Sequence, residues 1–323
     1  MKNPTLALCI PAYRAEQHLP RLLATAQQQD PPFDEIIVCV DSSPDRTAEI
    51  AKAWGVRVLV NKQNLGCSRS KNRTLEAASA DWVHFHDADD VLLPTFTAEA
   101  HRWMAMKDAP DVVIMGFEYR DFVTLELLAT GLVDDAALAS DPIGFSISCK
   151  LPNFGIYRRD KLVRVNGFDC DASVLYNEDV AFHTKLALAG FRFRASALIT
   201  SINWRHQESM SAENVVRCQM AHYAVMGKVA ECAHSRYLEG ISRNMWLAAQ
   251  GLAMHDEWEK VDLVLAEAQR IFGRVPSAMS RDFTLICRVF GPHFAFRLRE
   301  KYIRWFKPHL RRTKCHVETS KGA

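Results

Sequence analysis

Residues 82–90 read WVHFHDADD, a short apolar and aromatic run that ends in three aspartates within four positions. The first five residues have the length and composition of a buried strand, so Asp87, Asp89 and Asp90 should lie in the loop that follows it. Carboxylates this close together repel one another unless a cation or a solvated turn stabilises them. The stretch therefore predicts either a cation site or a solvated acidic turn.

Similar apolar runs lie on either side of this stretch, at residues 6–10, 36–40, 56–60 and 112–117. Segments with helical spacing separate several of them, among them residues 19–26 and 48–54. Strands that alternate with helices in this way predict an α/β fold, with a mostly parallel sheet and helices on both faces.

Polar residues follow the first four of these runs. They are Pro11 and Tyr13, then Asp41, Ser42, Ser43 and Asp45, then residues 61–66, and finally residues 87–90. Because ligands of parallel sheets bind at the carboxyl ends of the strands, we expect these groups to converge. This placement favours a cation site, and hard carboxylate oxygens favour magnesium or manganese, which keep waters and bind substrate phosphates.

The composition excludes several classes of protein. A formal net charge of +2 is too small for wholesale nucleic-acid binding, so no nucleic acid is expected as a partner. The nine cysteines form no Cys-x-x-Cys pair, which fits reduced thiols in the cytoplasm better than disulfides or a zinc site. No apolar run approaches the length of a spanning helix, so we expect a soluble protein or one that lies on a membrane surface.

The remaining sequence divides into a variable part and a helical part. Residues 118–150 show no clear period and are expected to form loops, whereas residues 213–306 have helical spacing and few glycines. We therefore expect an α/β domain over residues 1–211 and a helical C-terminal region over residues 212–323.

Taken together, the motifs resemble the inverting family 2 glycosyltransferases with the GT-A fold, of the bacterial cell-surface polysaccharide type. The resemblance covers roughly residues 4–211 and implies a Rossmann-like sheet that binds a nucleotide sugar. The segments that carry it are, in order, Pro11 and Tyr13, Asp41-Ser42-Ser43-x-Asp45, Asn64 with Gly66 and Asn72, Asp87-Ala88-Asp89-Asp90, Gly167-Phe168-Asp169, Asn177-Glu178-Asp179, and Arg205-His206 with Ser209 and Ser211. Each motif is weak alone, but all of them in order are specific.

The resemblance implies a role for each donor-site residue. Asp41 would accept a hydrogen bond from the ring N–H of uracil. Asp87 would meet the ribose or the metal, and Asp89 would hold Mn²⁺ or Mg²⁺ against the diphosphate. The other implied donor-binding residues are Pro11, Tyr13, Asn64, Gly66, Lys71 and Asn72.

The catalytic roles fall on a second acidic segment. Asp179 would be the general base that takes the proton of the acceptor hydroxyl, and Glu178 would contact or orient the acceptor. The same pair also fits an ordinary acidic first turn of a helix. His206 would be a metal ligand or a diphosphate donor, or else a packing residue before a helix.

Three positions depart from family patterns. Lys71 stands where arginine is usual and cannot offer a bidentate fork to a phosphate. Arg14 stands where asparagine is common, which leaves the role of the first loop open. Processive members carry Gln-x-x-Arg-Trp, but Lys301 occupies the glutamine position before Arg304-Trp305, so we expect transfer of a single sugar.

The C-terminal region ends in a basic and aromatic segment, residues 294–314. An apolar helical stripe of Phe294, Leu298, Tyr302, Trp305 and Phe306 is surrounded by Arg297, Arg299, Lys301, Arg304, Lys307, Arg311, Arg312 and Lys314. Such a stripe either binds an anionic membrane surface or packs on the catalytic domain.

The expected function is transfer of one sugar, with inversion, from a uridine diphosphate sugar to a hydroxyl of a glycan or lipid-linked acceptor. The expected setting is cell-surface polysaccharide synthesis, in the cytoplasm or at the inner face of the membrane. Two alternatives stay open: an inactive nucleotide-sugar or carbohydrate binder, and a sugar nucleotidyltransferase. The latter would need a glycine-rich phosphate loop where residues 11–16 contain no glycine.

Overall fold

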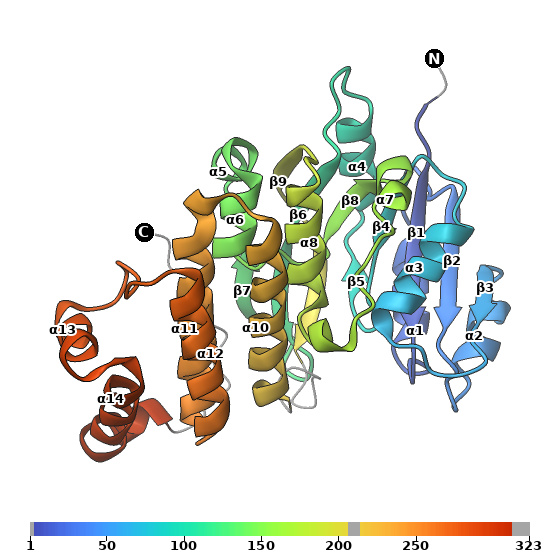
Figure 1. The fold of residues 1–323 in the computed structure, drawn as a ribbon. Coiled ribbons are helices and arrows are strands. Elements are labelled where there is room, and N and C mark those ends of the chain that lie inside the picture. Colours follow the sequence, from blue (N-terminus) through green and yellow to red (C-terminus); the bar gives the residue numbers. More distant parts are fainter. Residues whose placement is uncertain (1–2, 206–213, 312–323) are drawn as a thin grey trace. The chain divides into compact units, whose positions relative to one another are not determined.

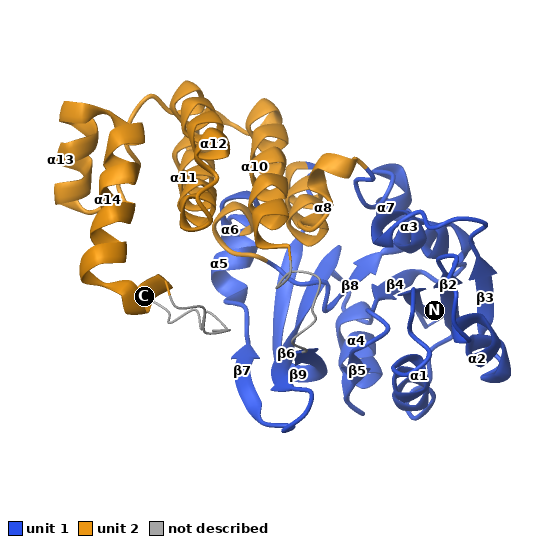
Figure 2. Ribbon diagram, turned by 90° about the horizontal axis from the view of Figure 1, so that it is seen from below, with its two compact units in different colours: residues 1–145, 151–170, 189–206 blue, residues 146–150, 171–188, 207–323 orange. Residues whose placement is uncertain are grey.

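A computed structural model describes residues 3–205 and 214–311. The chain forms two compact units (Figure 2). The sheet unit comprises residues 1–145, 151–170 and 189–206, and the helical unit comprises residues 146–150, 171–188 and 207–323. Residues 171–188, which carry Glu178 and Asp179, thus belong to the helical unit.

The sheet unit is built on one nine-stranded sheet with the order β3-β2-β1-β4-β8-β6-β9-β5, and β7 pairs with β6 (Figure 1). The strands are β1 (Leu6–Ala12), β2 (Glu35–Val40), β3 (Arg57–Val60), β4 (Trp82–Phe85), β5 (Val91–Leu92), β6 (Val112–Asp121), β7 (Leu127–Gly131), β8 (Gly155–Arg158) and β9 (Phe193–Arg205). The first four strands are parallel, as predicted. Beyond β4 the sheet is mixed, because β8 runs antiparallel to both β4 and β6 while β6 and β9 are parallel.

Helices cover both faces of this sheet, which confirms the predicted α/β class (Figure 2). They are α1 (Leu19–Gln27), α2 (Thr47–Ala53), α3 (Cys67–Ala77), α4 (Phe96–Met104), α5 (Asp135–Ser140) and α7 (Arg159–Arg164), while α6 (Pro142–Ser148) runs into the helical unit. Apolar residues of α1 and α4 pack with alternate residues of β1 and β2 in one buried core. The sheet edge at the ends of β1, β2 and β4 is therefore rigidly positioned.

The helical unit contains α8 (Glu178–Leu188), α10 (Val215–Cys232), α11 (Leu238–Met254), α12 (Trp258–Ile271), α13 (Arg281–Phe290) and α14 (Pro292–Phe306). Trp246 of α11 is buried against Phe296 of α14, with ring centroids 5.6 Å apart. The prediction of helices from residue 213 to residue 306 is confirmed for the described residues. Within residues 3–205 and 214–311, no helix has the length and apolarity needed to cross a membrane.

The prediction of loops for residues 118–150 is wrong. Strand β6 continues to Asp121, and β7, α5 and α6 follow it. Each of these last three elements has seven residues or fewer. Such short elements contain too few repeats for a helical or strand period to be visible in the sequence.

Candidate active site

The aspartate loop after β4 separates its three carboxylates by exposure. Asp87 and Asp89 are exposed, whereas Asp90 is buried. Asp90 accepts hydrogen bonds from Asn203 Nδ2 at 2.7 Å and from the backbone N–H of Trp204 at 3.0 Å. Burial, and then the charges of Asp89 and Asp87, raise the pKa of Asp90 well above its ordinary value. Asp90 therefore ties the loop to β9, and Asp87 and Asp89 face solvent.

Lys71 is buried on α3 and directs its charge at this loop. Its Nζ lies 3.1 Å from Asp87 Oδ1 and 5.4 Å from the ring centroid of Phe168. A buried ammonium needs a charged partner, and Asp87 supplies one. The lysine that replaces the usual arginine thus pairs with a carboxylate of the loop.

The carboxylates of Asp87 and Asp89 suit a magnesium or manganese ion whose other ligands are waters and substrate oxygens. Within residues 3–205 and 214–311, no group of three or more His, Cys, Asp or Glu side chains forms a complete metal site. Two exposed carboxylates suffice for such ions, which complete their shell with waters and phosphate oxygens. His206, the third predicted metal residue, lies outside the described residues.

Asp41 lies at the end of β2 and organises the loop before α3. Its Oδ1 accepts from Asn61 Nδ2 at 2.6 Å and from the Leu65 N–H at 2.8 Å, and its Oδ2 accepts from the Gly66 N–H at 2.8 Å. Gly66 has φ +87°, a conformation that favours glycine. Since each carboxylate oxygen can accept about two hydrogen bonds, Oδ2 retains room for one more donor.

The other donor-site candidates lie around this edge in different ways. Pro11 lies within β1, Tyr13 follows it and is 45% exposed, and Asn64 Oδ1 accepts from the Gly66 N–H at 3.2 Å. The side-chain amide of Asn72 instead forms hydrogen bonds with the backbone of Phe168. Its Nδ2 donates to the Phe168 carbonyl at 3.0 Å, and its Oδ1 accepts from the Phe168 N–H at 2.8 Å. These two bonds anchor the segment after α7, and the donor-binding role of Asn72 stays a prediction.

Glu178 and Asp179 occupy the first turn of α8 in the helical unit. Glu178 is buried and Asp179 is half-buried. His183 Nδ1 lies 2.8 Å from the backbone carbonyl of Asp179, one turn earlier. Both carboxylates thus lie at the positive end of the α8 helix dipole.

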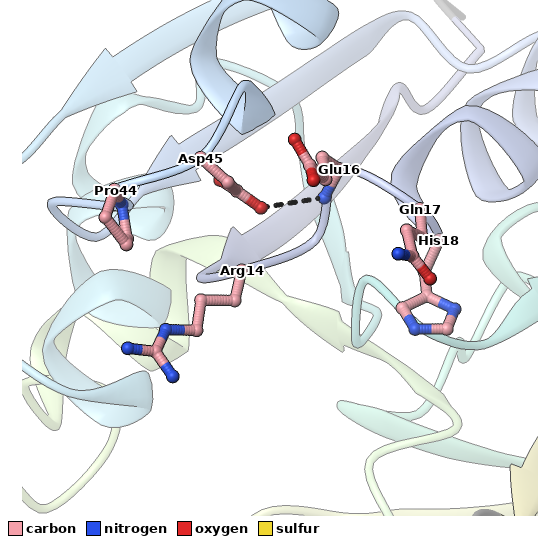
Figure 3. A pocket seen from close by; sticks show the side chains of 6 residues that line it. All are labelled: Arg14, Glu16, Gln17, His18, Pro44 and Asp45. Atoms are coloured by element: carbon pink, nitrogen blue, oxygen red, sulfur yellow. Dashed lines mark hydrogen bonds between the residues drawn. The ribbon is translucent and has the colours of Figure 1, made fainter.

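A pocket of about 430 Å³ lies between the loops after β1 and β2, lined by Arg14, Glu16, Gln17, His18, Pro44 and Asp45 (Figure 3). The Asp45 carboxylate accepts hydrogen bonds from Ser43, Thr47 and the Glu16 N–H. Burial opposes this ionised form, but the hydrogen bonds prevail and lower the pKa of Asp45 to about 2. The lining includes none of the predicted donor-binding residues, although Arg14 comes from the loop whose role the sequence left open.

Sequence reasoning missed Arg21. Its guanidinium lies against two aromatic rings, 5.3 Å from the centroid of Phe122 and 4.4 Å from that of Trp204. Burial lowers the pKa of Arg21, and the charges of Asp90 and Asp89 oppose that shift. The sequence shows only that Arg21 stands beside the apolar positions of α1, and this pattern does not reveal which rings the side chain contacts.

Comparison with known proteins identifies a matching family and similar chains. Residues 7–165 match the family described as glycosyl transferase family 2. The chain is 26% identical over 268 residues to a protein of Escherichia coli (strain K12) named "Uncharacterized glycosyltransferase YibD", covering 75% of each chain.

Two solved structures share the fold. TarS residues 1–349 from S. aureus, in complex with UDP, superpose with a TM-score of 0.68 at 18% identity, over 93% of this chain and 91% of that one. The mannosyltransferase PcManGT from Pyrobaculum calidifontis, in complex with GDP-Man and Mn²⁺, gives a TM-score of 0.60 at 17% identity, over 94% and 86%. The fold is that of the GT-A glycosyltransferases, and residues 7–165 match glycosyl transferase family 2.

Proposed function

We propose that the protein transfers one sugar, with inversion, from a uridine diphosphate sugar to a hydroxyl of a glycan or lipid-linked acceptor in cell-surface polysaccharide synthesis. The observation that carries the proposal is the loop after β4, where Asp87 and Asp89 are exposed beside the buried cation of Lys71. Related folds bound to UDP or to GDP-Man with Mn²⁺ support a nucleotide-sugar donor.

At the diphosphate, Asp89 and Asp87 would hold Mn²⁺ or Mg²⁺. Held there, such an ion would offset the negative charge that grows on the diphosphate oxygens as the bond to the sugar breaks. Lys71 fixes the orientation of Asp87, because their charged atoms lie 3.1 Å apart. Asp90 limits the movement of the loop through its bonds to Asn203 and Trp204.

At the acceptor, Asp179 would take the proton of the attacking hydroxyl. The hydroxyl oxygen forms a bond to the anomeric carbon from the face opposite the diphosphate, and the bond from that carbon to the diphosphate oxygen breaks. The electron pair leaves with the nucleoside diphosphate, so the anomeric configuration inverts. Glu178, one residue earlier, would orient the acceptor.

We expect uridine diphosphate to raise the melting temperature more than cytidine diphosphate does. Uracil has a ring N–H that can donate a hydrogen bond to Asp41 Oδ2, whereas cytosine presents a lone pair at the same position. An unmatched buried acceptor costs on the order of 1–3 kcal/mol, so affinity should differ about 10- to 100-fold. Thermal shifts measured with manganese test this. Equal shifts would show that Asp41 does not read the base.

The proposed membrane contact rests on the exposed face of α14. Phe294, Leu298 and Tyr302 are about half exposed, and Trp305 and Phe306 are 81% and 69% exposed. Lys301 and Lys307 are exposed on the same segment. This face suits an anionic membrane surface, which would place the protein at the inner face of the cytoplasmic membrane.

Three other cations of this segment form ion pairs within the helical unit. Arg297 pairs with Asp262 at 2.8 Å, Arg304 with Asp256 at 2.9 Å, and Arg311 with Glu300 at 2.6 Å. Asp262 and Asp256 are acids from outside the segment, which the sequence pattern did not reveal. Arg312 and Lys314 lie outside the described residues. The aromatic face therefore carries more of the proposed membrane contact than the number of cations suggests.

Replacing Trp305 and Phe306 together by serine should lower binding to anionic vesicles at least about tenfold, because each buried aromatic contributes on the order of 1.5 kcal/mol or more. Deleting the whole segment is less informative, since it also removes the buried Phe296. Leu263→Ser, at an exposed apolar position of α12, is the matched control. Vesicle sedimentation at low and high salt measures the effect. An intact protein that never binds such vesicles at low salt would refute the membrane contact.

A further inference from the structure

The turn that leads into Glu178 and Asp179 is held in a strained conformation. Tyr176 has φ +75°, in the left-handed region that residues with a side chain rarely adopt. Asn177 follows it and is buried, and α8 begins at the next residue. Such conformations persist only where the surrounding structure fixes them, and they cluster at functional sites.

Helix α10 supplies the contacts that fix this turn. Arg217 Nη1 donates to Tyr176 Oη at 3.1 Å, and His222 Nδ1 lies 3.4 Å from the side-chain oxygen of Asn177. Nearer the C-terminal end of the same helix, Lys228 Nζ lies 2.8 Å from Asp171 Oδ2. A single helix therefore holds the segment before α8 at three places within the helical unit.

The His222 ring is itself held from the other side. Its Nε2 lies 3.1 Å from Asn244 Oδ1, and Asn244 Nδ2 donates to the carbonyls of Ile147 and Gly240, both at 2.9 Å. Since the Asn244 amide nitrogen is occupied by carbonyls, its oxygen must accept, and His222 Nε2 carries the proton. Burial, and then the charge of Lys150, lower the pKa of His222 to about 4, so the ring is neutral near pH 7.

A neutral ring with its proton on Nε2 presents a lone pair at Nδ1. Asn177 meets that lone pair best with its amide NH₂ group, which a half-turn of the amide places at the same position. The chain Asn244–His222–Asn177 then has one consistent direction of donation. It fixes the residue immediately before Glu178 and Asp179.

We propose that α10 positions the carboxylates of the α8 first turn for the transfer reaction, with His222 and Arg217 as positioning residues. The inference rests on the proposed function, because it takes Asp179 as the general base. Proton transfer needs the base within hydrogen-bond reach of the acceptor hydroxyl, and a displacement near 1 Å can cost on the order of 100-fold in rate. Loss of the contact should therefore act on turnover rather than on donor binding.

The test compares His222→Phe, which keeps the ring shape without its polar atoms, with Ser242→Ala. Ser242 is buried on α11 and donates to the Ala268 carbonyl at 3.1 Å, so its loss removes an interhelical bond far from the turn in sequence. We expect His222→Phe to lower kcat about 10- to 100-fold with donor KM within about twofold of the parent. Ser242→Ala should change the melting temperature but leave kcat nearly unchanged.

Rescue separates positioning from packing. His222→Asn places a polar atom near the former Nδ1 and should recover much of kcat, whereas the side chain of His222→Gln reaches toward Asn244 and should recover less. Arg217 is exposed, so Arg217→Leu should fold normally and lower kcat in the same direction if His222→Phe proves unstable. A kcat for both His222→Phe and Arg217→Leu no lower than that of Ser242→Ala would overturn the inference. If Asp179→Asn is also fully active, the proposed base fails as well; if Asp179→Asn is inactive, only the positioning role fails.

Discussion

Asp179→Asn should lower kcat about 100- to 10,000-fold, because a sugar hydroxyl is a poor nucleophile at neutral pH unless a base takes its proton. Asparagine keeps the shape of the side chain and removes its basicity. Asp179 is half-buried at the start of α8, so the substitution should leave the fold intact. The thermal shift produced by uridine diphosphate should stay nearly unchanged, since the proposed role of Asp179 lies at the acceptor.

Glu178→Gln is the matched control for this prediction. The residue is the neighbour of Asp179 in the same first turn, and its proposed role is to orient the acceptor. We expect the substitution to raise acceptor KM and to affect kcat less. Steady-state kinetics with varied acceptor distinguish the two variants. A fully active Asp179→Asn would move the base elsewhere, and Glu178 would be the next residue to test.

Asp89→Ala should abolish the manganese-dependent part of nucleotide binding and, with it, turnover. Asp89 is exposed in the loop after β4, so its loss should not change the melting temperature of the protein without ligand. Binding raises apparent stability in proportion to RT ln(1 + [L]/Kd), so the thermal shift by uridine diphosphate with manganese measures the effect directly. The shift should fall to the value obtained in excess chelator.

Asp108→Ala controls for the loss of one exposed carboxylate elsewhere in the sheet unit. It should leave the manganese-dependent shift unchanged. The manganese-dependent thermal shift of Asp89→Asn should lie between those of the parent and of Asp89→Ala, because the amide oxygen can still bind a hard cation but carries no charge. Full activity of the parent protein in excess chelator would contradict the metal requirement.

The parallel half of the sheet could be predicted because its signals are local. Each of β1 to β4 is a short apolar run followed at once by polar or turn-forming residues, so both the strand and its carboxyl end are visible in the sequence. The antiparallel half could not be predicted in the same way. Strand β8 has only four residues, and its two partners, β4 and β6, are separated from it by other elements of the chain.

In the candidate site, the sequence likewise revealed which residues are present but not which partners they contact. The sequence identified the aspartates after β4, but it could not show that Asp90 is buried against Asn203, which lies 113 positions away. Likewise it flagged Lys71 as a departure without its partner Asp87. The role of Asn72 was the least visible, because its contact with the backbone of Phe168 depends on how α3 and the segment after α7 pack.

The anomeric configuration of the first-formed product tests the central claim most directly. A single displacement, with Asp179 as base and the nucleoside diphosphate as leaving group, transfers the sugar with one inversion. Proton NMR of the product should therefore show, from the coupling at the anomeric carbon, the configuration opposite to that of the donor. A product that retains the donor configuration would contradict the single-displacement mechanism, whatever the Asp179 and Asp89 variants do.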